Sequence, residues 1–166
     1  MAKKNDKNKG KNEKTNVMRL LEQAKIAYIP HVFEGAEGLT GLELAEALGQ
    51  NPESVFKTLV TVGKSGEHYV FVIPVAEELD LKKAAASVGE KSIAMIKSKE
   101  LLPLTGYIHG GCSPIGMKKF FTTTFHETAV IQDRIYFSGG RVGYQVEINP
   151  EDIGKIIEYQ TGDVIV

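Results

Sequence analysis

One stretch of eight residues constrains the fold of this chain more than any other. Residues 55–62, Val-Phe-Lys-Thr-Leu-Val-Thr-Val, carry β-branched and aromatic side chains on both faces, which is typical of a strand buried inside a sheet. Lys57 interrupts this pattern, and removing an ammonium group from water costs free energy unless the group meets a partner or a polar cavity. Two interpretations are open. The methylenes of Lys57 pack while its charge reaches solvent, or the charge points into a polar site where it meets a ligand.

Length and charge narrow the class of protein. At 166 residues the chain is long enough for one domain with its own core, and 42% hydrophobic residues is ordinary for such a domain. The net charge of −1 argues against a DNA-binding protein that holds long duplexes through many phosphates, although recognition of a nucleic-acid end needs few such contacts. No apolar run is long enough to span a bilayer and no signal-peptide core follows Met1, so we expect no membrane partner and a cytoplasmic location.

The first residues differ in composition from the rest. Residues 1–14 contain six lysines against Asp6 and Glu13, and they have few apolar side chains. Because such a segment cannot bury enough apolar surface to fold, we expect a disordered basic tail over residues 1–14 and a single domain over residues 15–166. A solvated tail and a tail weakly attracted to RNA both fit this composition.

Capping residues and apolar periodicity predict the helices and strands. Five helices are expected to begin after the caps Thr15, Thr40, Asp80, Ser98 and Asn149. The fourth should be brief, ended by Pro103 and Gly106. Strands are expected at about residues 27–33, 55–62, 68–73, 93–96, 120–123, 129–131, 134–137, 142–148 and 163–166.

The order of these elements predicts the fold class. Residues 63–66 should form the turn of an antiparallel hairpin, and Gln132-Asp133 should form a second one. Regular alternation of strands and helices is absent. The pattern therefore predicts an α+β fold, in which four to five helices pack on a curled, mainly antiparallel mixed sheet or barrel.

Several side chains could carry chemistry. Cys112 and His109 share one glycine-rich loop, which could hold a thiol nucleophile and its base, but no third group that would orient them is evident. The four histidines lack metal-ligand spacing, so we expect no metal site. The pairs Gly110-Gly111 and Gly139-Gly140 could cradle a phosphate or a carbonyl oxygen, and they could equally be plain turns.

Four motifs, in order and at consistent spacing, resemble the YbaK family. They are Val-Phe-Lys-Thr-Leu at 55–59, Leu-Asp-Leu-Lys-Lys-Ala at 79–84, Thr-Gly-Tyr at 105–107 with Gly-Gly-Cys-Ser-Pro-Ile-Gly-Met-Lys-Lys at 110–119, and Ile-Tyr-Phe-Ser-Gly-Gly at 135–140. These proteins are free-standing aminoacyl-tRNA deacylases related to the editing domain of bacterial prolyl-tRNA synthetase. The resemblance runs from about Thr15 to the C-terminus, and the Cys-tRNA(Pro) deacylase branch fits better than the alanine-specific branch.

The resemblance also implies which residues act. Lys57 matches the essential lysine of the family. The substrate pocket that the resemblance implies contains Phe33, Thr58, Gly110, Gly111, Ser138 and Gly139. Phe33 stands where characterised relatives carry a tyrosine, so a hydrogen bond from that hydroxyl is absent or replaced. Cys112 stands where relatives carry an apolar residue, which argues against Cys112 as a required nucleophile.

The activity implied is hydrolysis of mischarged tRNA, chiefly cysteine esterified to tRNA(Pro) and also Cys-tRNA(Cys), without a cofactor. The family nucleophile is the thiol of the substrate, and such an intramolecular attack gains up to roughly 7–11 kcal/mol from orientation. Lys57 would hold the terminal ribose-phosphate or the oxyanion, with further donors from the amides of Gly110 and Gly111. Because the chain has few surplus cations, we expect it to contact only the acceptor end and to rely on prolyl-tRNA synthetase for tRNA selection.

Three alternatives remain open on the sequence alone. A catalytically silent binding module could use the same pocket, and the loss of a tyrosine hydroxyl at Phe33 keeps this alternative open. An editing enzyme could prefer another small amino acid such as alanine. A generic hydrolase could use Cys112 with His109.

Overall fold

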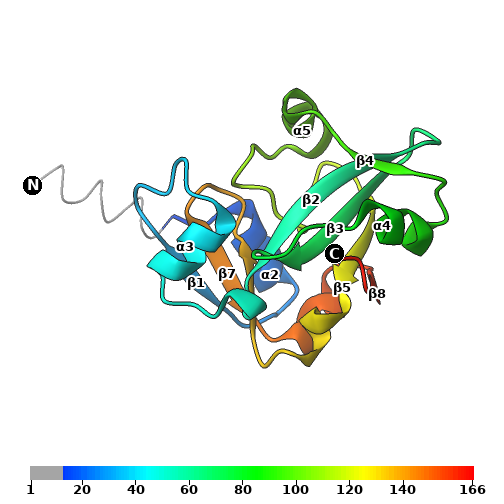
Figure 1. The fold of residues 1–166 in the computed structure, drawn as a ribbon. Coiled ribbons are helices and arrows are strands. Elements are labelled where there is room, and N and C mark those ends of the chain that lie inside the picture. Colours follow the sequence, from blue (N-terminus) through cyan, green and yellow to red (C-terminus); the bar gives the residue numbers. More distant parts are fainter. Residues whose placement is uncertain (1–12) are drawn as a thin grey trace, which may run out of the picture.

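The computed structural model describes residues 13–166 as two β-sheets with helices around them (Figure 1). The α-helices are α2 (Asn16–Gln23), α3 (Gly41–Ala47), α4 (Leu81–Val88) and α5 (Ser98–Thr105). The 3-10 helices are η1 (Pro52–Ser54), η2 (Glu127–Ile131) and η3 (Pro150–Lys155). The strands are β1 (Tyr28–Val32), β2 (Phe56–Gly63), β3 (His68–Pro74), β4 (Ile93–Met95), β5 (Thr122–His126), β6 (Ile135–Ser138), β7 (Tyr144–Ile148) and β8 (Gln160–Gly162). The predicted α+β class is confirmed.

The larger sheet has the strand order β4-β2-β3-β5-β8. Its β2–β3 hairpin is antiparallel, as predicted, while β5 runs parallel to both of its neighbours. The smaller sheet, β1-β7-β6, is antiparallel throughout, and a single bridge from Val55 to Tyr136 links it to the larger one. Within the described residues the sheets stay open, so the prediction of a mainly antiparallel mixed sheet is confirmed and the barrel form is not adopted.

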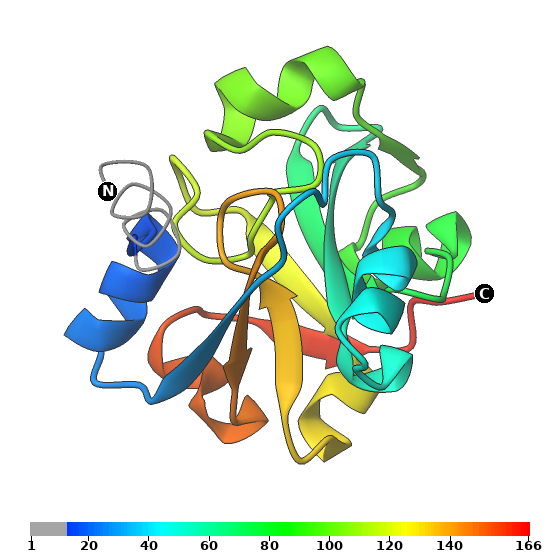
Figure 2. The same cartoon turned by 90° about the vertical axis from the view of Figure 1, so that its left-hand side faces the viewer.

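Most of the core lies between the two sheets and α2. Val17 and Leu21 of α2 are fully buried, and they belong to the same cluster as Phe125 of β5 and Phe137 of β6. A second cluster lies on the other face of the larger sheet, where α4 covers β3. Figure 2 shows α2 at the outer side of the smaller sheet and α5 at the opposite end of the molecule from η2 and η3.

Side-chain caps fix where three helices begin. The Thr15 hydroxyl accepts from the Met18 N–H, Thr40 forms a reciprocal capping box with Glu43, and Asp80 accepts from two N–H groups of the first turn of α4. These caps confirm the predicted starts. For α5 the prediction is wrong by one position, because Lys97 is the N-cap and Ser98 is the first helical residue. Pro103 lies inside α5, and the left-handed Gly106 ends it.

Four other predictions need correction. Residues 129–131 form part of η2 instead of a strand, so no hairpin forms at Gln132-Asp133. The last helix, although capped by Asn149 as predicted, is the 3-10 helix η3. The strand predicted at 120–123 begins at Thr122, and the final strand is β8, with only one bridge, Leu79 to Ile165, further on.

The predicted disordered tail falls almost wholly outside the described residues. Two of its members, Glu13 and Lys14, are described, and they pair with Arg141 at 3.0 Å and Glu22 at 2.7 Å. None of the helices described in residues 13–166 is long and apolar enough to cross a membrane.

Candidate functional site

The first half of β2 lies on an open edge of the larger sheet. At one end of this edge, strand β4 pairs only with Thr61, Val62 and Gly63. At the other end of the same edge, the bridge to Tyr136 involves only Val55. No strand of the described chain pairs with residues 56–60 on this edge, where the Ile96 N–H reaches the Val60 carbonyl at 3.4 Å. The edge therefore has a gap between the two sheets.

The hydrogen-bonding pattern of β2 shows which backbone groups face this gap. The Val55 carbonyl accepts from the Val75 N–H at 2.9 Å, so Val55 directs its backbone groups toward β3. Alternate residues of an antiparallel strand direct these groups to opposite sides. Lys57 and Leu59 therefore bond to β3, whereas the N–H and C=O of Thr58 point to the open edge.

A cavity of about 510 Å³ opens at this gap. It is lined by the loop and helix start at 36–41 with Leu44, by residues 55–59 with Val75, by Leu101 of α5, by His109, Gly110 and Cys112, and by residues 137–138 and 142–145. Segments far apart in the sequence thus meet here. Of the residues predicted to act, Lys57, Thr58, Gly110 and Ser138 line this cavity.

Lys57 is half-buried in the cavity wall. Burial lowers the pKa of its ammonium group, and the negative charges of Glu78 and Glu77 oppose this shift. Within residues 13–166 the ammonium has no hydrogen-bond or ion-pair partner. A cation held without a partner beside a cavity favours the interpretation of Lys57 as a ligand-binding charge over that of a snorkelling surface lysine.

Thr58 adds a second unsatisfied group to the same wall. Its Oγ1 is buried and has no hydrogen-bond partner among the described residues. Buried hydroxyls are usually hydrogen-bonded, so an orphan beside a cavity indicates a place where a ligand or water can bind. Thr58 thus offers a hydroxyl and two backbone groups at one position.

The two predicted glycine turns are both present, but they contribute less than expected. Gly110 has φ +87° and lines the cavity. Gly111 lies outside the lining, and its N–H donates to the Ile108 carbonyl at 3.0 Å, so it is not free to bind an oxyanion in this structure. A Cβ at Gly111 would lie 3.2 Å from the backbone of Arg141, which gives this glycine a packing reason instead.

In the second glycine turn, too, one predicted residue lines the cavity and the other does not. The Ser138 hydroxyl lines the cavity and accepts from the Gly140 N–H at 3.1 Å, which leaves its own O–H hydrogen available to a ligand. The Gly139 N–H is used in the turn, donating to the Tyr144 carbonyl at 2.8 Å, and Gly139 is not part of the lining.

Phe33 is also outside the lining. It is partly buried at the end of β1, and its N–H donates to the Gly143 carbonyl at 2.9 Å. This bond joins the segment that leads to Ala36 with residues 142–145, so Phe33 supports the cavity wall without forming it.

Cys112 lines the cavity, but it is a poor candidate nucleophile. Burial raises the pKa of its thiol to about 12, so the thiol is protonated at neutral pH. His109 lines the same cavity on the exposed part of the loop, and no hydrogen bond joins it to Cys112 within the described chain.

Gln145 is a cavity residue that the sequence analysis missed. It is 4% exposed, and its Oε1 accepts from Gln50 Nε2 at 2.6 Å. The alternation along residues 142–148 places Gln145 opposite the apolar face, which suggested exposure to solvent. Only the packing of the segment after α3 onto this face reveals that the side chain is buried. No group of three or more His, Cys, Asp or Glu residues in the described chain is arranged to hold a metal ion.

Comparison with known families shows which family this cavity belongs to. Residues 37–156 match the model of the aminoacyl-tRNA editing domain, and this span includes every lining residue except Ala36. The chain belongs to the aminoacyl-tRNA editing domain family.

Individual relatives agree with this assignment. The editing domain is 44% identical over 153 residues to the Enterococcus faecalis protein named "Putative Cys-tRNA(Pro)/Cys-tRNA(Cys) deacylase EbsC", covering 92% of this chain and 93% of the relative. It is 33% identical over 82 residues to proline–tRNA ligase of Shouchella clausii, covering 49% of this chain and 14% of the ligase.

A solved structure shows the same fold. "Crystal structure of a putative trans-editing enzyme for prolyl tRNA synthetase" superposes with a TM-score of 0.78 at 23% identity, covering 93% of this editing domain and 99% of that chain. The resemblance to free-standing editing deacylases, inferred from four motifs, is thereby confirmed.

Proposed function

We propose that this editing domain is an aminoacyl-tRNA deacylase that hydrolyses mischarged Cys-tRNA(Pro) in trans, with Cys-tRNA(Cys) as a second substrate of the same chemistry. The observation that carries the proposal is the partner-free, half-buried Lys57 in the cavity at the open edge of β2. The similarity over 93% of a relative named as a Cys-tRNA deacylase supports the choice of amino acid and tRNA.

The substrate supplies its own nucleophile in this proposal. An aminoacyl ester is already activated, so the protein has only to orient the thiol of the substrate toward the ester carbonyl and to stabilise the negative charge that develops there. The sulfur loses its proton and attacks the carbonyl carbon, the ester C–O bond breaks, and the 3′-terminal ribose oxygen leaves as a hydroxyl with a proton that replaces the one lost by the thiol. Water then hydrolyses the resulting cyclic thioester to free cysteine. Orientation alone can contribute up to roughly 7–11 kcal/mol to such a step.

The lining residues divide the remaining tasks. Lys57 binds the terminal ribose-phosphate or the oxyanion, because it is the lysine among the lining residues and its charge has no partner within the described chain. The Thr58 N–H on the open edge and the Ser138 O–H supply further donors, replacing the Gly111 amide that its turn already uses. One well-placed oxyanion donor is typically worth about 3–4 kcal/mol.

Prolyl-tRNA synthetase is the proposed protein partner. The described chain is acidic overall, so contacts with the body of the tRNA are expected to be few, and selection of tRNA(Pro) would come from the synthetase. The similarity to part of a proline–tRNA ligase and to a trans-editing enzyme structure supports this link. The complex would act in the cytoplasm, where translation takes place.

A substrate series tests the proposal. We expect the wild-type chain to deacylate Cys-tRNA(Pro) at least about 100-fold faster than α-aminobutyryl-tRNA(Pro), in which a methyl group replaces the thiol, because only the thiol can attack the ester. Comparable rates on the two esters would overturn the thiol-assisted mechanism. Faster turnover of Ala-tRNA(Pro) would assign the enzyme to alanine editing, and no turnover of any ester would leave only a binding module.

A further inference from the structure

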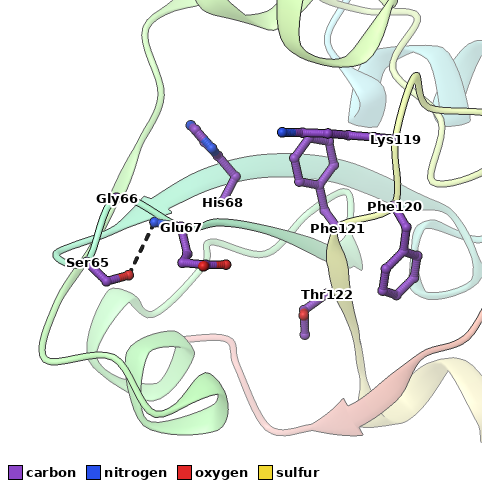
Figure 3. Close-up of a pocket in the computed structure, with 8 residues that line it drawn as sticks. All are labelled: Ser65, Gly66, Glu67, His68, Lys119, Phe120, Phe121 and Thr122. Atoms are coloured by element: carbon purple, nitrogen blue, oxygen red, sulfur yellow. Dashed lines mark hydrogen bonds between the residues drawn. The ribbon is translucent and has the colours of Figure 1, made fainter.

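A second hollow lies away from the candidate site, between the β2–β3 turn and the start of β5. Its volume is about 460 Å³, and it is lined by residues 65–68 and 119–122 (Figure 3). The proposed chemistry uses none of these residues. Figure 3 shows His68 and Lys119 on one side of the sheet edge and Phe120 projecting on the other.

The side chains around this hollow combine exposed aromatic surface with positive charge. Phe120 is 62% exposed, so its ring is available for contact with a ligand. On the other side of the sheet edge, the Lys119 ammonium lies 5.3 Å from the centre of the Phe121 ring, and the His68 and Phe121 rings make an edge-to-face contact with 6.1 Å between centroids (Figure 3). Exposed aromatic rings next to lysines are what single-stranded nucleic acids bind, through base stacking and phosphate contacts.

The segment that leads into the hollow is more positively charged than the rest of the described chain. Residues 91–119 contain five lysines against one acid, Glu100, whereas the rest of the described chain is acidic. The five are Lys91, Lys97, Lys99, Lys118 and Lys119, and all are exposed. Glu100 caps α5 by accepting from the Lys97 N–H at 2.9 Å, so its carboxylate is already engaged.

Two contacts connect this lysine-rich segment to neighbouring elements. The Lys64 N–H donates to the Ser92 carbonyl at 3.0 Å, which brings the β2–β3 turn beside the segment that begins at Lys91. Lys118 Nζ reaches the Pro103 carbonyl at 3.4 Å, which ties α5 to the residues entering the hollow.

Two carboxylates lie nearby. Glu90 is occupied by the hydroxyls of Ser65 and Tyr69, whereas Glu67 lines the hollow. A phosphate is therefore expected on the Lys119 side of the hollow.

The hollow and the candidate site are joined by one segment. His109, Gly110 and Cys112 line the cavity that contains Lys57, and the same loop continues to residues 119–122 at the hollow. Along β2, Thr58 at the cavity and Val62, which pairs with His68 at the hollow, are about 13 Å apart at roughly 3.3 Å per residue. An extended strand of a few nucleotides can span this separation.

We propose that this hollow binds an unpaired nucleotide of the substrate tRNA just upstream of the aminoacylated 3′ end, with Phe120 stacking on the base and Lys119 contacting the phosphate. The identity of the RNA rests on the proposed function, while the preference for a single-stranded nucleotide rests on the hollow itself.

Binding of uncharged tRNA(Pro) and single-turnover deacylation of Cys-tRNA(Pro) test this proposal with Phe120→Ala and Lys119→Gln. Loss of one stacking aromatic corresponds to roughly 5- to 150-fold weaker binding, so we expect Phe120→Ala to raise Kd about tenfold and to raise KM with little change in kcat. Lys119→Gln should lower the slope of log Kd against log salt by about 0.7, the value for one phosphate of a single strand. A tRNA that lacks its unpaired 3′ nucleotides should bind wild type and Phe120→Ala equally.

Matched controls come from the far end of the molecule. Ile131→Ala on η2 removes a side chain that is 76% exposed, and Lys155→Ala on η3 removes an exposed lysine, so both should leave Kd and KM unchanged. Unchanged tRNA binding in both hollow variants would overturn the proposal. An effect of Phe120→Ala that appears only when prolyl-tRNA synthetase is added would assign the hollow to a protein partner and overturn it as well. If wild type binds tRNA through Phe120 but deacylates nothing, the proposed function fails and this inference stands.

Discussion

At the scale of single residues, the site depends on a lysine kept partly out of water. Burial lowers the pKa of Lys57, which means that the folded protein disfavours its charged form relative to the unfolded chain. This unfavourable contribution is fully present at pH values below the folded pKa, including neutral pH, and it is lost as the pH rises from the folded pKa to above the unfolded value of 10.5. A position that reduces stability and faces a cavity is typical of a functional group.

The lowered pKa predicts the alkaline side of the pH profile. If deacylation needs the charged ammonium, kcat/KM for Cys-tRNA(Pro) should rise as the substrate thiol ionises and fall at a pH below 10.5, the ordinary lysine value. Rates are measured after subtraction of spontaneous ester hydrolysis. A rate that still climbs through pH 10.5 would exclude a role for the charge of Lys57.

Cys112, unlike Lys57, is expected to contribute little to the rate of deacylation. Its thiol is neutral at physiological pH because burial raises the pKa to about 12. Cys112→Ala should therefore keep kcat/KM within about threefold of wild type, with any loss arising from the altered shape of the cavity. A loss of 100-fold or more, measured on the same ester, would revive the generic hydrolase with a cysteine nucleophile.

At the scale of elements, the gap in the β2 edge exists because short segments stop on either side of it. Strand β4 ends at Met95, and the smaller sheet forms its one backbone bridge to this edge at Val55, the residue before β2. The part of the cavity wall formed by residues 142–145 requires a glycine at Gly143. Gly143 has φ +83°, and a Cβ added there would overlap the Phe33 carbonyl oxygen. A side chain at Gly143 would push this wall away from β1.

Gly143→Ala should therefore lower the free energy of unfolding by at least about 2 kcal/mol, because it combines left-handed backbone strain with a clash against backbone. Gly162→Ala is a matched control, since no atom lies within 4 Å of its added Cβ and its φ is not in the left-handed range. Urea unfolding measures both. Equal midpoints for the two variants would show that the wall tolerates a side chain.

The sequence predicted the local features of helices and strands far better than it predicted which strands pair with each other. Caps at Thr15, Thr40 and Asp80 involve residues two or three positions apart, so they can be recognised directly. The parallel pairing of β3 with β5 joins residues about 50 positions apart and has no local signal. The strand prediction for residues 129–131 is wrong for a related reason. Their β-branched composition suits a strand, while tertiary packing makes them part of a 3-10 helix.

The site shows the same limit. The resemblance placed Lys57, Thr58, Gly110 and Ser138 at one cavity, and the structure brings these four together. It did not reveal that the N–H groups of Gly111 and Gly139 are used within their own turns, since this depends on backbone geometry. Gln145 was missed because burial of a polar strand residue depends on the segment that covers it.

At the scale of the whole molecule, the C-terminus closes the fold that carries the site. Val164 is fully buried against α4 and β3, and its carbonyl accepts from the Asp80 N–H at 2.8 Å. The last residues thus cover the face of the larger sheet opposite the main core.

Val164→Ala should lower the free energy of unfolding by about 1.5–3 kcal/mol, because it leaves a small cavity in this cluster. Val166→Ala removes the same atoms from a side chain that is 76% exposed and should change stability by less than about 0.5 kcal/mol. Thermal or urea unfolding of the two variants provides the comparison. A difference below about 0.5 kcal/mol would mean that the C-terminus is not part of the cooperative unit.

The most direct test of the account is single-turnover deacylation of Cys-tRNA(Pro) by wild type and Lys57→Met, a substitution that keeps the length of the side chain and removes its charge. We predict a loss of at least about 100-fold in the rate of ester cleavage, the usual size of losing one electrostatic donor, with a urea midpoint no lower than that of wild type because burial already disfavours the charge. A folded Lys57→Met protein that cleaves the ester within threefold of the wild-type rate would contradict the assignment of this cavity as the active site.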